Sequence, residues 1–312
     1  MSVFNQAFDK VFVQGRVTVG LMTPIQGEQG VLADLEVAQQ HARLADELGF
    51  AALWTRDVPL MIPQGSANET AALDDPFLWL AAMAAVTRNI VLGTGAIVLP
   101  LRHPLHVAKA ALTLDRISHG RLILGVGSGD RPPEFARFGV DLETRDVTFR
   151  EHWDVVRAVL APSSDPASAG SAGAEDYRVL PAPQARIPMI AVGSARQSLQ
   201  WIAEHADGWA SYHREEARQK GRIELWQMAQ QQRSPGLSKP FIQSVQLDLL
   251  DDPDAPAEPI ELGLRTGRHA LAAYLERMRE LGVAHVLFNL TRSGRPVDDI
   301  LRELGQHILP QR

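Results

Sequence analysis

The chain alternates short apolar segments with longer segments whose apolar residues recur at helical spacing. Eight such pairs follow residue 15, and the short segments are apolar on both faces, which is typical of buried parallel strands. The predicted strands are Arg16–Met22, Ala51–Thr55, Ile90–Val98, Arg121–Val126, Ile187–Val192, Gly208–Ser211, Phe241–Leu247 and Ala284–Asn289. The predicted helices are Val31–Leu48, Asp75–Val86, Pro104–Ile117, Asp146–Leu160, Arg196–His205, Glu215–Gln231, Arg268–Leu281 and Val297–Leu309.

This strict alternation predicts an α/β protein with a parallel sheet, and eight units favour a (β/α)8 TIM barrel. Periodicity alone leaves an open, doubly wound sheet as the alternative. No G-x-G-x-x-G turn follows the first strand, which weakens a dinucleotide-binding interpretation. A chain of 312 residues, 45% of them hydrophobic, can bury one large core, so we expect residues 1–312 to form a single domain.

Three longer connections lack a clear period and predict insertion loops after strands 2, 4 and 7. They are Val58–Asp74, Pro162–Asp176 and Asp251–Gly267. The second is rich in Ser, Ala, Gly and Pro, which predicts a mobile insertion over residues 162–176. The first two are candidate lids over a ligand site. At the amino terminus, Phe4, Phe8 and Phe12 recur at helical spacing and predict a short helix docked on the body.

The composition excludes several classes of function. The chain contains no cysteine, so disulfides, thiolate metal sites and a cysteine nucleophile are impossible, and a reducing cytoplasm is the expected compartment. The formal charge is −6 and no basic run is interleaved with aromatic residues, so we expect no nucleic-acid partner. No apolar stretch reaches the roughly 18–20 residues of a membrane span. No His, Asp or Glu cluster has the spacing of metal ligands, so we expect no metal.

In a barrel of this kind the chemistry belongs to the loops that follow the strands. Thr94, Gly95 and Ala96 end the third strand without a bulky side chain, so a flat ligand could approach the backbone there; alternatively, they fill the interior of the barrel. A glycine-rich stretch with Gly127 ends the fourth strand, and it either cradles a phosphate or provides a turn with positive φ. After the fifth strand, Ser194 opens a possible anion site at a helix start, or simply caps that helix.

Taken together, these segments resemble the bacterial luciferase-like, flavin-dependent superfamily over about residues 16–212. The resemblance is carried by LGTGAIVLPLRHP, LDRISHGRLILGVGSG, FARFGVD and GSARQSLQWIAEHADGW. Members are (β/α)8 barrels that use reduced flavin and oxygen, or a deazaflavin coenzyme, to oxidise small substrates. The resemblance therefore implies a flavin-type cofactor at the carboxyl ends of the strands.

Particular residues follow from this resemblance. It implies a flavin ring over Thr94, Gly95 and Ala96, with a non-proline cis peptide bond between Gly95 and Ala96. It implies that Gly127 and Ser128 lie beside the ring and the phosphate. The cradle for the cofactor phosphate would consist of Gly193, Ser194, Ala195 and Ser198.

Two positions depart from the luciferase pattern. Gly127 stands where luciferase has a reactive cysteine, so no thiol can adjust the flavin. Asp57 matches an acidic residue after the second strand, but Val58 stands where the catalytic histidine would follow. Light emission from an aldehyde is therefore not expected.

Acid–base chemistry must then come from other residues. Arg56 and Asp57 close the second strand and are candidate catalytic residues; the alternative is a structural ion pair or a contact between subunits. His213, just past the sixth strand, is the third candidate. Arg292 after the last strand either binds an anion or is solvated, and His285 is expected in the core.

The leading hypothesis is a two-component monooxygenase that uses reduced FMN and oxygen on a small organic substrate. No nicotinamide-binding motif is evident, which favours a separate flavin reductase as the partner. The alternatives are a deazaflavin-dependent hydride-transfer enzyme and a flavin-binding protein without turnover. The alanine-rich helices after the second and third strands suggest a homodimer, although they also suit the outer ring of a barrel.

Overall fold

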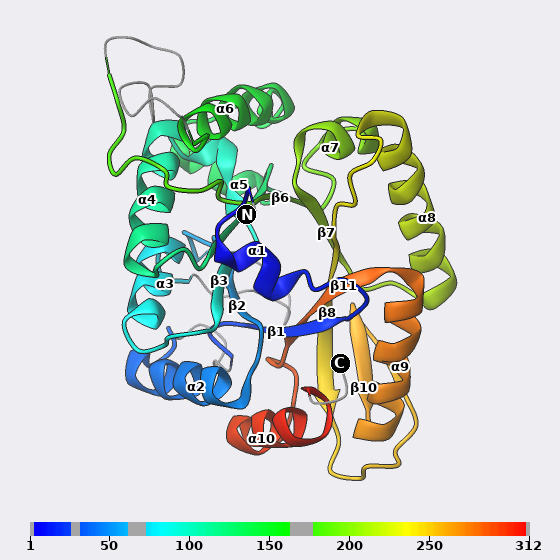
Figure 1. Cartoon of the computed structure of the whole chain (residues 1–312). Coiled ribbons are helices and arrows are strands. Elements are labelled where there is room, and N and C mark those ends of the chain that lie inside the picture. Colours follow the sequence, from blue (N-terminus) through cyan, green and yellow to red (C-terminus); the bar gives the residue numbers. More distant parts are fainter. Residues whose placement is uncertain (1–2, 26–31, 62–72, 163–176, 310–312) are drawn as a thin grey trace.

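A closed barrel of eight parallel strands forms the centre of the protein. The computed structural model describes residues 3–25, 32–61, 73–162 and 177–309. The last barrel strand pairs in parallel with both the first strand and the seventh, which closes the sheet and confirms the predicted TIM barrel (Figure 1). The barrel strands are β1 (Thr18–Met22), β2 (Ala52–Thr55), β3 (Val91–Thr94), β5 (Leu122–Gly127), β6 (Met189–Val192), β7 (Gly208–Tyr212), β8 (Phe241–Leu249) and β11 (Val283–Asn289).

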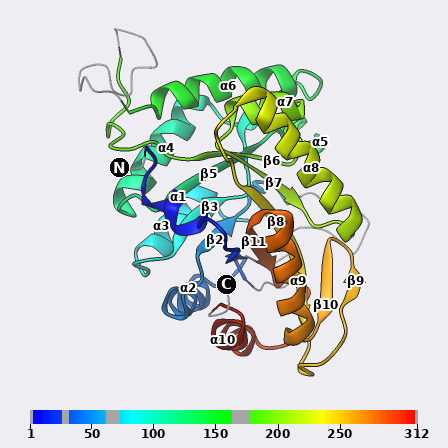
Figure 2. The ribbon, with the colours of Figure 1, turned by 45° about the vertical axis from the view of Figure 1, so that its right-hand side comes forward.

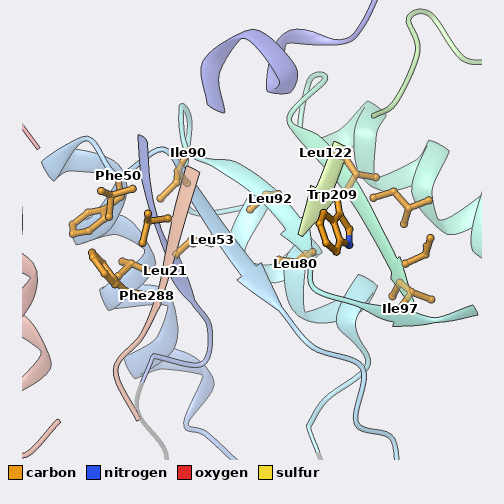
Figure 3. Packing of buried hydrophobic residues seen from close by; sticks show 14 of the residues in the cluster. Leu21, Phe50, Leu53, Leu80, Ile90, Leu92, Ile97, Leu122, Trp209 and Phe288 are labelled. Atoms are coloured by element: carbon orange, nitrogen blue, oxygen red, sulfur yellow. The ribbon is translucent and has the colours of Figure 1, made fainter. Parts of the chain in front are cut away.

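Helices surround this barrel and cover the outward faces of its strands (Figures 1 and 2). They are α2 (Leu35–Leu48), α3 (Pro76–Ala84), α4 (Pro104–Ile117), α5 (Pro132–Phe138), α6 (Arg145–Val159), α7 (Leu199–His205), α8 (Glu216–Arg233), α9 (Arg268–Leu281) and α10 (Val297–His307). The main core lies between the two layers, where Leu21, Leu53 and Phe288 point outward from the strands (Figure 3). Burial of this apolar surface is what holds the helices on the barrel.

Side-chain caps decide where two of these helices begin. Asp34 accepts hydrogen bonds from the backbone N–H groups of Glu36 and Val37, at 2.8 and 3.1 Å, so α2 begins four residues later than the predicted Val31. Asp75 caps α3 in the same way, with Pro76 in the first turn, as the sequence predicts.

The interior of the barrel is filled by a second, smaller apolar cluster around Trp54. A β-carbon on Gly93 would lie 2.3 Å from the Trp54 ring, and one on Gly20 would lie 2.6 Å from Nε2 of His285. The two glycines therefore leave the space that the large rings of Trp54 and His285 occupy. His285 is confirmed as a core residue.

The predicted amino-terminal helix is α1 (Gln6–Val11), and it covers the amino-terminal end of the barrel (Figure 1). Ala7 and Val11 are buried in the same cluster as Trp54. The Ala7 N–H donates to the carbonyl of Gly120 at 3.2 Å, which attaches α1 to the turn before β5. One end of the barrel is thus closed, and the opposite end carries the carboxyl termini of the strands.

One predicted loop is partly a β-hairpin. Within Asp251–Gly267, the chain forms β9 (Glu258–Ile260) and β10 (Gly263–Thr266), and β10 pairs in parallel with β8 (Figure 2). The prediction was wrong because β8 runs beyond its pairing with β7, and its remaining backbone groups need partners. A short polar segment supplies them without any apolar alternation of its own.

Other differences concern element boundaries. The predicted third strand, Ile90–Val98, divides into β3 and a two-residue strand β4 (Ile97–Val98), which pairs with β5. Helix α5 was not predicted; its seven residues begin with two prolines and are too few to show a period.

The predicted mobile insertion falls almost entirely on residues 163–176, which lie outside the described residues. A lid over this segment stays a prediction. The other candidate lid, Val58–Asp74, is described only at residues 58–61 and 73–74.

Burial makes His285 a source of acid sensitivity. The Trp54 indole N–H can only donate, so Nε2 of His285 accepts at 3.0 Å, and its Nδ1 donates to the Thr18 hydroxyl at 2.7 Å. That hydroxyl donates in turn to the Val11 carbonyl at 2.6 Å. Burial lowers the pKa of His285 to about 3, so the ring stays neutral in the folded protein.

We expect this histidine to destabilise the protein in acid. Its pKa in the unfolded chain is about 6.5, so the free energy of unfolding should fall as the pH drops from about 6.5 towards 3, by about 1.4 kcal/mol per pH unit for this group. In His285→Gln, the free energy of unfolding should depend less on pH, by the equivalent of about one proton taken up on unfolding. Chemical denaturation at a series of pH values measures this dependence. His307→Gln, at an exposed position on α10, should keep the original slope. Equal slopes in all three proteins would contradict the assignment.

Candidate active site

The carboxyl ends of the strands form the end of the barrel opposite α1, and we call this end the mouth of the barrel. Side chains alternate along a strand, and Ala52 and Trp54 on β2 and Ala210 on β7 belong to the interior cluster. The next inward positions towards the mouth are therefore Arg56 on β2 and Tyr212 on β7. These two strands are four steps apart in either direction around the barrel, so their residues face each other across the mouth.

Small residues form a strip at the ends of two neighbouring strands of this mouth, β3 and β5. The Gly95–Ala96 peptide bond is cis, as the resemblance implies. A β-carbon on Gly127 would lie 3.4 Å from the Ala96 β-carbon and 3.5 Å from the Val192 carbonyl oxygen. Gly95, Ala96 and Gly127, which were expected from separate segments, therefore lie side by side. Gly95 and Ala96 are partly exposed and Gly127 is buried, and none of the three carries a side chain larger than a methyl group.

The side chain of Thr94 forms a contact within the barrel wall and does not take the role expected for it beside a flavin ring. Its buried hydroxyl donates to the Gly125 carbonyl at 2.8 Å and accepts from the Gly125 N–H at 2.9 Å. A β-carbon on Gly125 would lie only 1.9 Å from the Thr94 carbonyl oxygen, so glycine is needed for this close approach. The side chain of Thr94 joins β3 to β5, which leaves only its backbone for a ligand. Ser128, at the end of β5, is also buried.

The expected phosphate cradle is a turn rather than the start of a helix. Gly193, Ala195 and Arg196 have positive φ values of 66°, 46° and 57°, and α7 begins only at Leu199. The cap of α7 is Ser198, whose hydroxyl accepts from the Trp201 N–H at 3.1 Å, so the alternative that Ser194 caps it was wrong. Since left-handed residues break the helical path, the predicted start at Arg196 was three residues early.

This turn is nevertheless built to present backbone donors beside the strip. Gly193 directly follows Val192, which adjoins Gly127, and Trp209 donates from its indole N–H to the Gly193 carbonyl at 2.7 Å. Among the described residues, the N–H groups of Ser194 and Ala195 have no acceptor. Successive backbone N–H groups in such turns bind anions. Ser194 itself is exposed, and its hydroxyl accepts only a 3.3 Å bond from the Arg196 N–H.

Arg56 is a half-buried cation without a carboxylate partner among the described residues. Its Nε is buried and donates to no acceptor in this part of the chain. Burial lowers the pKa of Arg56, the Tyr212 phenol opposes this shift, and the nearby Arg131 adds to it. The inward-facing end of β2 thus carries a positive charge that the protein itself does not neutralise.

Asp57, the next residue, has a structural partner. Its carboxylate accepts two hydrogen bonds from Arg102, both at 2.8 Å, and one from the Val98 N–H at 3.1 Å. Arg102 also donates to Asp75, the cap of α3, at 2.9 Å, and these contacts raise the pKa of the guanidinium despite its burial. The ion pair anchors the segment after Gly95–Ala96 to β2 and α3. Of the two interpretations of Asp57, the structural ion pair is the one that this geometry supports.

His213 lies on the other side of the barrel wall. Its Nδ1 is 3.0 Å from the Tyr274 hydroxyl and 3.1 Å from Nε2 of Gln243, so the ring packs between the sheet and α9. Burial lowers the pKa of His213, and the charge of Glu216 opposes this shift. This position gives no support to a catalytic role for His213.

Sequence reasoning missed Tyr212, Arg102 and Arg131. Tyr212 shares the inward parity of Ala210, and this pattern could have identified it instead of its neighbour His213. Arg131 binds the buried carboxylate of Glu134 at 2.7 Å on α5, a helix that was not predicted. Arg292, left open by the sequence, forms an exposed ion pair with Glu261.

Further features lie away from the mouth. A groove of about 330 Å³ opens on the opposite face, where Lys10, Thr18 and Asn89 are among its lining residues. It adjoins the amino ends of the strands, where conserved chemistry is not expected in this fold. The described residues contain no group of three His, Cys, Asp or Glu side chains that could hold a metal ion. They also contain no helix long and apolar enough to cross a membrane.

Comparison with known proteins gives the class. The family described as luciferase-like monooxygenase matches residues 11–287, and the chain belongs to this family. It is therefore an oxidoreductase of the luciferase-like type.

Two relatives and one solved structure are examples of the proteins that this chain resembles in sequence or in fold. An uncharacterised protein of Mycobacterium bovis is 31% identical over 265 residues, which cover 76% of this chain and 90% of the relative. The 4-hydroxyprotoasukamycin monooxygenase of Streptomyces nodosus subsp. asukaensis is 35% identical over 128 residues, 41% of this chain and 31% of that protein. An F420-dependent secondary alcohol dehydrogenase in complex with an F420-acetone adduct has the same fold, with a TM-score of 0.74 and 17% identity over 95% of this chain and 99% of that one.

Substitution of the two serines of the predicted cradle should have different effects, one on FMN binding and the other on stability. If the turn binds a cofactor phosphate, Ser194→Ala should weaken binding of reduced FMN by roughly 1–2 kcal/mol and leave reduced riboflavin, which lacks the phosphate, unchanged. Ser198→Ala should instead lower the stability by about 0.5–2 kcal/mol, because it removes the cap of α7. Anaerobic titration and thermal unfolding measure the two effects. Equal loss of FMN and riboflavin in Ser194→Ala would place the phosphate elsewhere.

Proposed function

We propose that this protein is a flavin-dependent monooxygenase of the two-component type, which uses reduced FMN and oxygen on a small organic substrate. The observation that carries the proposal is the strip of Gly95, Ala96 and Gly127 at the mouth of a luciferase-like barrel. A flat ring can lie against such a strip, because no side chain projects from it. The turn at Ser194 adjoins the strip and offers backbone donors for a phosphate.

The residues present fit a flavin cofactor in this way. The backbone of Thr94–Ala96, together with Gly127 and Ser128, would hold the ring, and the turn of Gly193, Ser194 and Ala195 would hold the phosphate. Ser198 contributes to this arrangement by capping α7 and so fixing the end of the turn. When bound, reduced flavin supplies the electrons that activate oxygen.

The chain itself has the tasks of binding, orientation and exclusion of water. Arg102 and Asp57 hold the strip in position through the Val98 backbone. Arg56 supplies fixed positive charge at the mouth, which stabilises negative charge more strongly there than in water. Partial burial raises the pKa of Tyr212, the charge of Asp130 raises it further, and Arg56 opposes them, so Tyr212 remains a hydroxyl donor at neutral pH.

FMN is preferred over a deazaflavin coenzyme in this proposal for two reasons. Two similar proteins are named as monooxygenases, the 4-hydroxyprotoasukamycin monooxygenase above and the limonene 1,2-monooxygenase of Rhodococcus erythropolis. The formal charge of −6 also disfavours a coenzyme with a long acidic tail. A separate reductase would supply the reduced FMN, and the cysteine-free chain suits the reducing cytoplasm.

Anaerobic titration of the apoprotein with reduced FMN, and separately with the reduced deazaflavin coenzyme, tests the cofactor. We expect FMN to bind more tightly. Gly127→Leu should reduce that affinity by about 10-fold or more, because its side chain would cover the strip. Gly221→Leu is the matched control, since a β-carbon at this position on α8 meets nothing within 4 Å. Tighter binding of the deazaflavin would assign hydride transfer instead, and binding of neither would leave only the fold in common with the family.

We also propose a homodimer through α3. Leu78 is 73% exposed on this helix, which contains only apolar residues, and Leu35 and Val37 of α2 are exposed as well. Burial of such side chains in a second copy would stabilise the pair. Light scattering should give the mass of a dimer, and Leu78→Glu should shift it towards that of a single chain. A monomeric mass for the unsubstituted protein would contradict this proposal.

A further inference from the structure

Arg56, Arg102 and Arg131 lie near the mouth of the barrel, and among the described residues Arg56 differs from the other two in having no anionic partner. Arg102 is paired with Asp57 and Asp75, and Arg131 is paired with Glu134. Arg56 has no hydrogen-bond acceptor among the described residues, and its Nε is fully buried. Buried guanidinium groups are normally matched by a carboxylate, because desolvation of the charge is otherwise uncompensated.

The other charges around Arg56 do not neutralise it. Asp57 is adjacent in sequence but faces the opposite side of the strand, where Arg102 occupies both of its oxygens. Arg131 is close enough to lower the pKa of Arg56 further, and the Tyr212 phenol opposes this shift. The carboxylate of Asp130 acts on Tyr212, and no described carboxylate forms a hydrogen bond or an ion pair with Arg56. The inward side of this end of β2 therefore has an excess of positive charge.

Tyr212 adds a second donor on the facing wall. It lies on β7, diametrically opposite β2, and half of its side chain is exposed to the mouth. A phenol hydroxyl and a guanidinium that face each other can both donate to one ligand oxygen pair. Neither group belongs to the strip of small residues or to the turn at Ser194.

We propose that Arg56 and Tyr212 bind a planar anionic group of the substrate, a carboxylate or an equivalent delocalised oxyanion. This inference rests on the proposed function, since it assigns the substrate class of the same site. The phosphate of a cofactor has its own candidate donors on β6, three strands away from β2 around the barrel. The substrate of this enzyme is accordingly a small organic acid rather than a neutral hydrocarbon or aldehyde.

Calorimetric titration of the flavin-free protein with benzoate tests the proposal, with benzamide as the neutral molecule of the same shape. We expect benzoate to bind at least about 10-fold more tightly than benzamide. Arg56→Met should weaken benzoate by about 10-fold or more and leave benzamide unchanged, and Tyr212→Phe should weaken benzoate by about 3- to 10-fold. Arg43→Met, at an exposed position on α2, should leave benzoate binding unchanged.

Thermal unfolding separates a binding role from a structural one. Without ligand, Arg56→Met should keep or raise the melting temperature, because it removes a buried charge without a partner. Benzoate should raise the melting temperature of the unsubstituted protein and not that of Arg56→Met. A large loss of stability in ligand-free Arg56→Met would mean that Arg56 is structural and would overturn the proposal.

Titration with benzoate in the presence of reduced FMN, under anaerobic conditions, shows whether Arg56 binds a substrate anion or the cofactor. Unchanged benzoate affinity in the FMN-loaded protein would support a separate substrate site. Competition between benzoate and FMN would assign Arg56 to the cofactor and overturn the substrate proposal. The flavin-free titration gives its answer whether or not FMN binds, so failure of the cofactor proposal is recognised separately. Equal binding of benzoate and benzamide, or no binding of benzoate, would also overturn the proposal.

Discussion

The narrow interior of the barrel must be filled, and the hydrogen-bonded rings of Trp54 and His285 lie at its centre together with a cluster of apolar side chains. Eight parallel strands can close only if their inward side chains fit together, and Gly20 and Gly93 leave the room that the two rings need. The pair also satisfies its own polar atoms through Thr18 and the Val11 carbonyl. Helix α1 closes the amino-terminal end of the barrel, and the packed interior lies between α1 and the residues of the mouth.

The mouth is then organised by the alternation of side chains on β2. Trp54 faces inward, and because side chains alternate, Arg56 also faces inward and reaches the mouth. Asp57 faces outward, towards Arg102 and the cap of α3. One residue of this neighbouring pair stabilises the segment that carries Gly95 and Ala96. The other keeps a charge that no described residue neutralises. Of these two adjacent residues after β2, Asp57 makes the structural contacts and Arg56 is the one that we propose for binding.

The same division appears on β7 and in the turn after β6. Tyr212 faces the mouth, whereas His213 packs against Tyr274 outside the barrel. Ser198 caps α7, whereas Ser194 remains exposed in the turn before it. In both cases one residue makes the structural contact, and the other is exposed without such a contact among the described residues. This arrangement places the positive end of the mouth opposite a hydroxyl donor, beside an uncovered strip of small residues.

The sequence by itself determined the succession of strands and helices and the small residues of the strip, and it favoured a barrel over an open sheet, which only the pairing of β11 with β1 and β8 decided. These features depend on periodicity, caps and glycine content, which are local properties of the chain. The tertiary structure decided which of two adjacent residues faces the mouth, since the phase of a strand depends on what packs inside the closed sheet. It also decided that β10 extends the sheet beside β8, and that Arg102, some 45 residues along the chain, is the partner of Asp57. Such pairings join distant segments, and no local pattern encodes them.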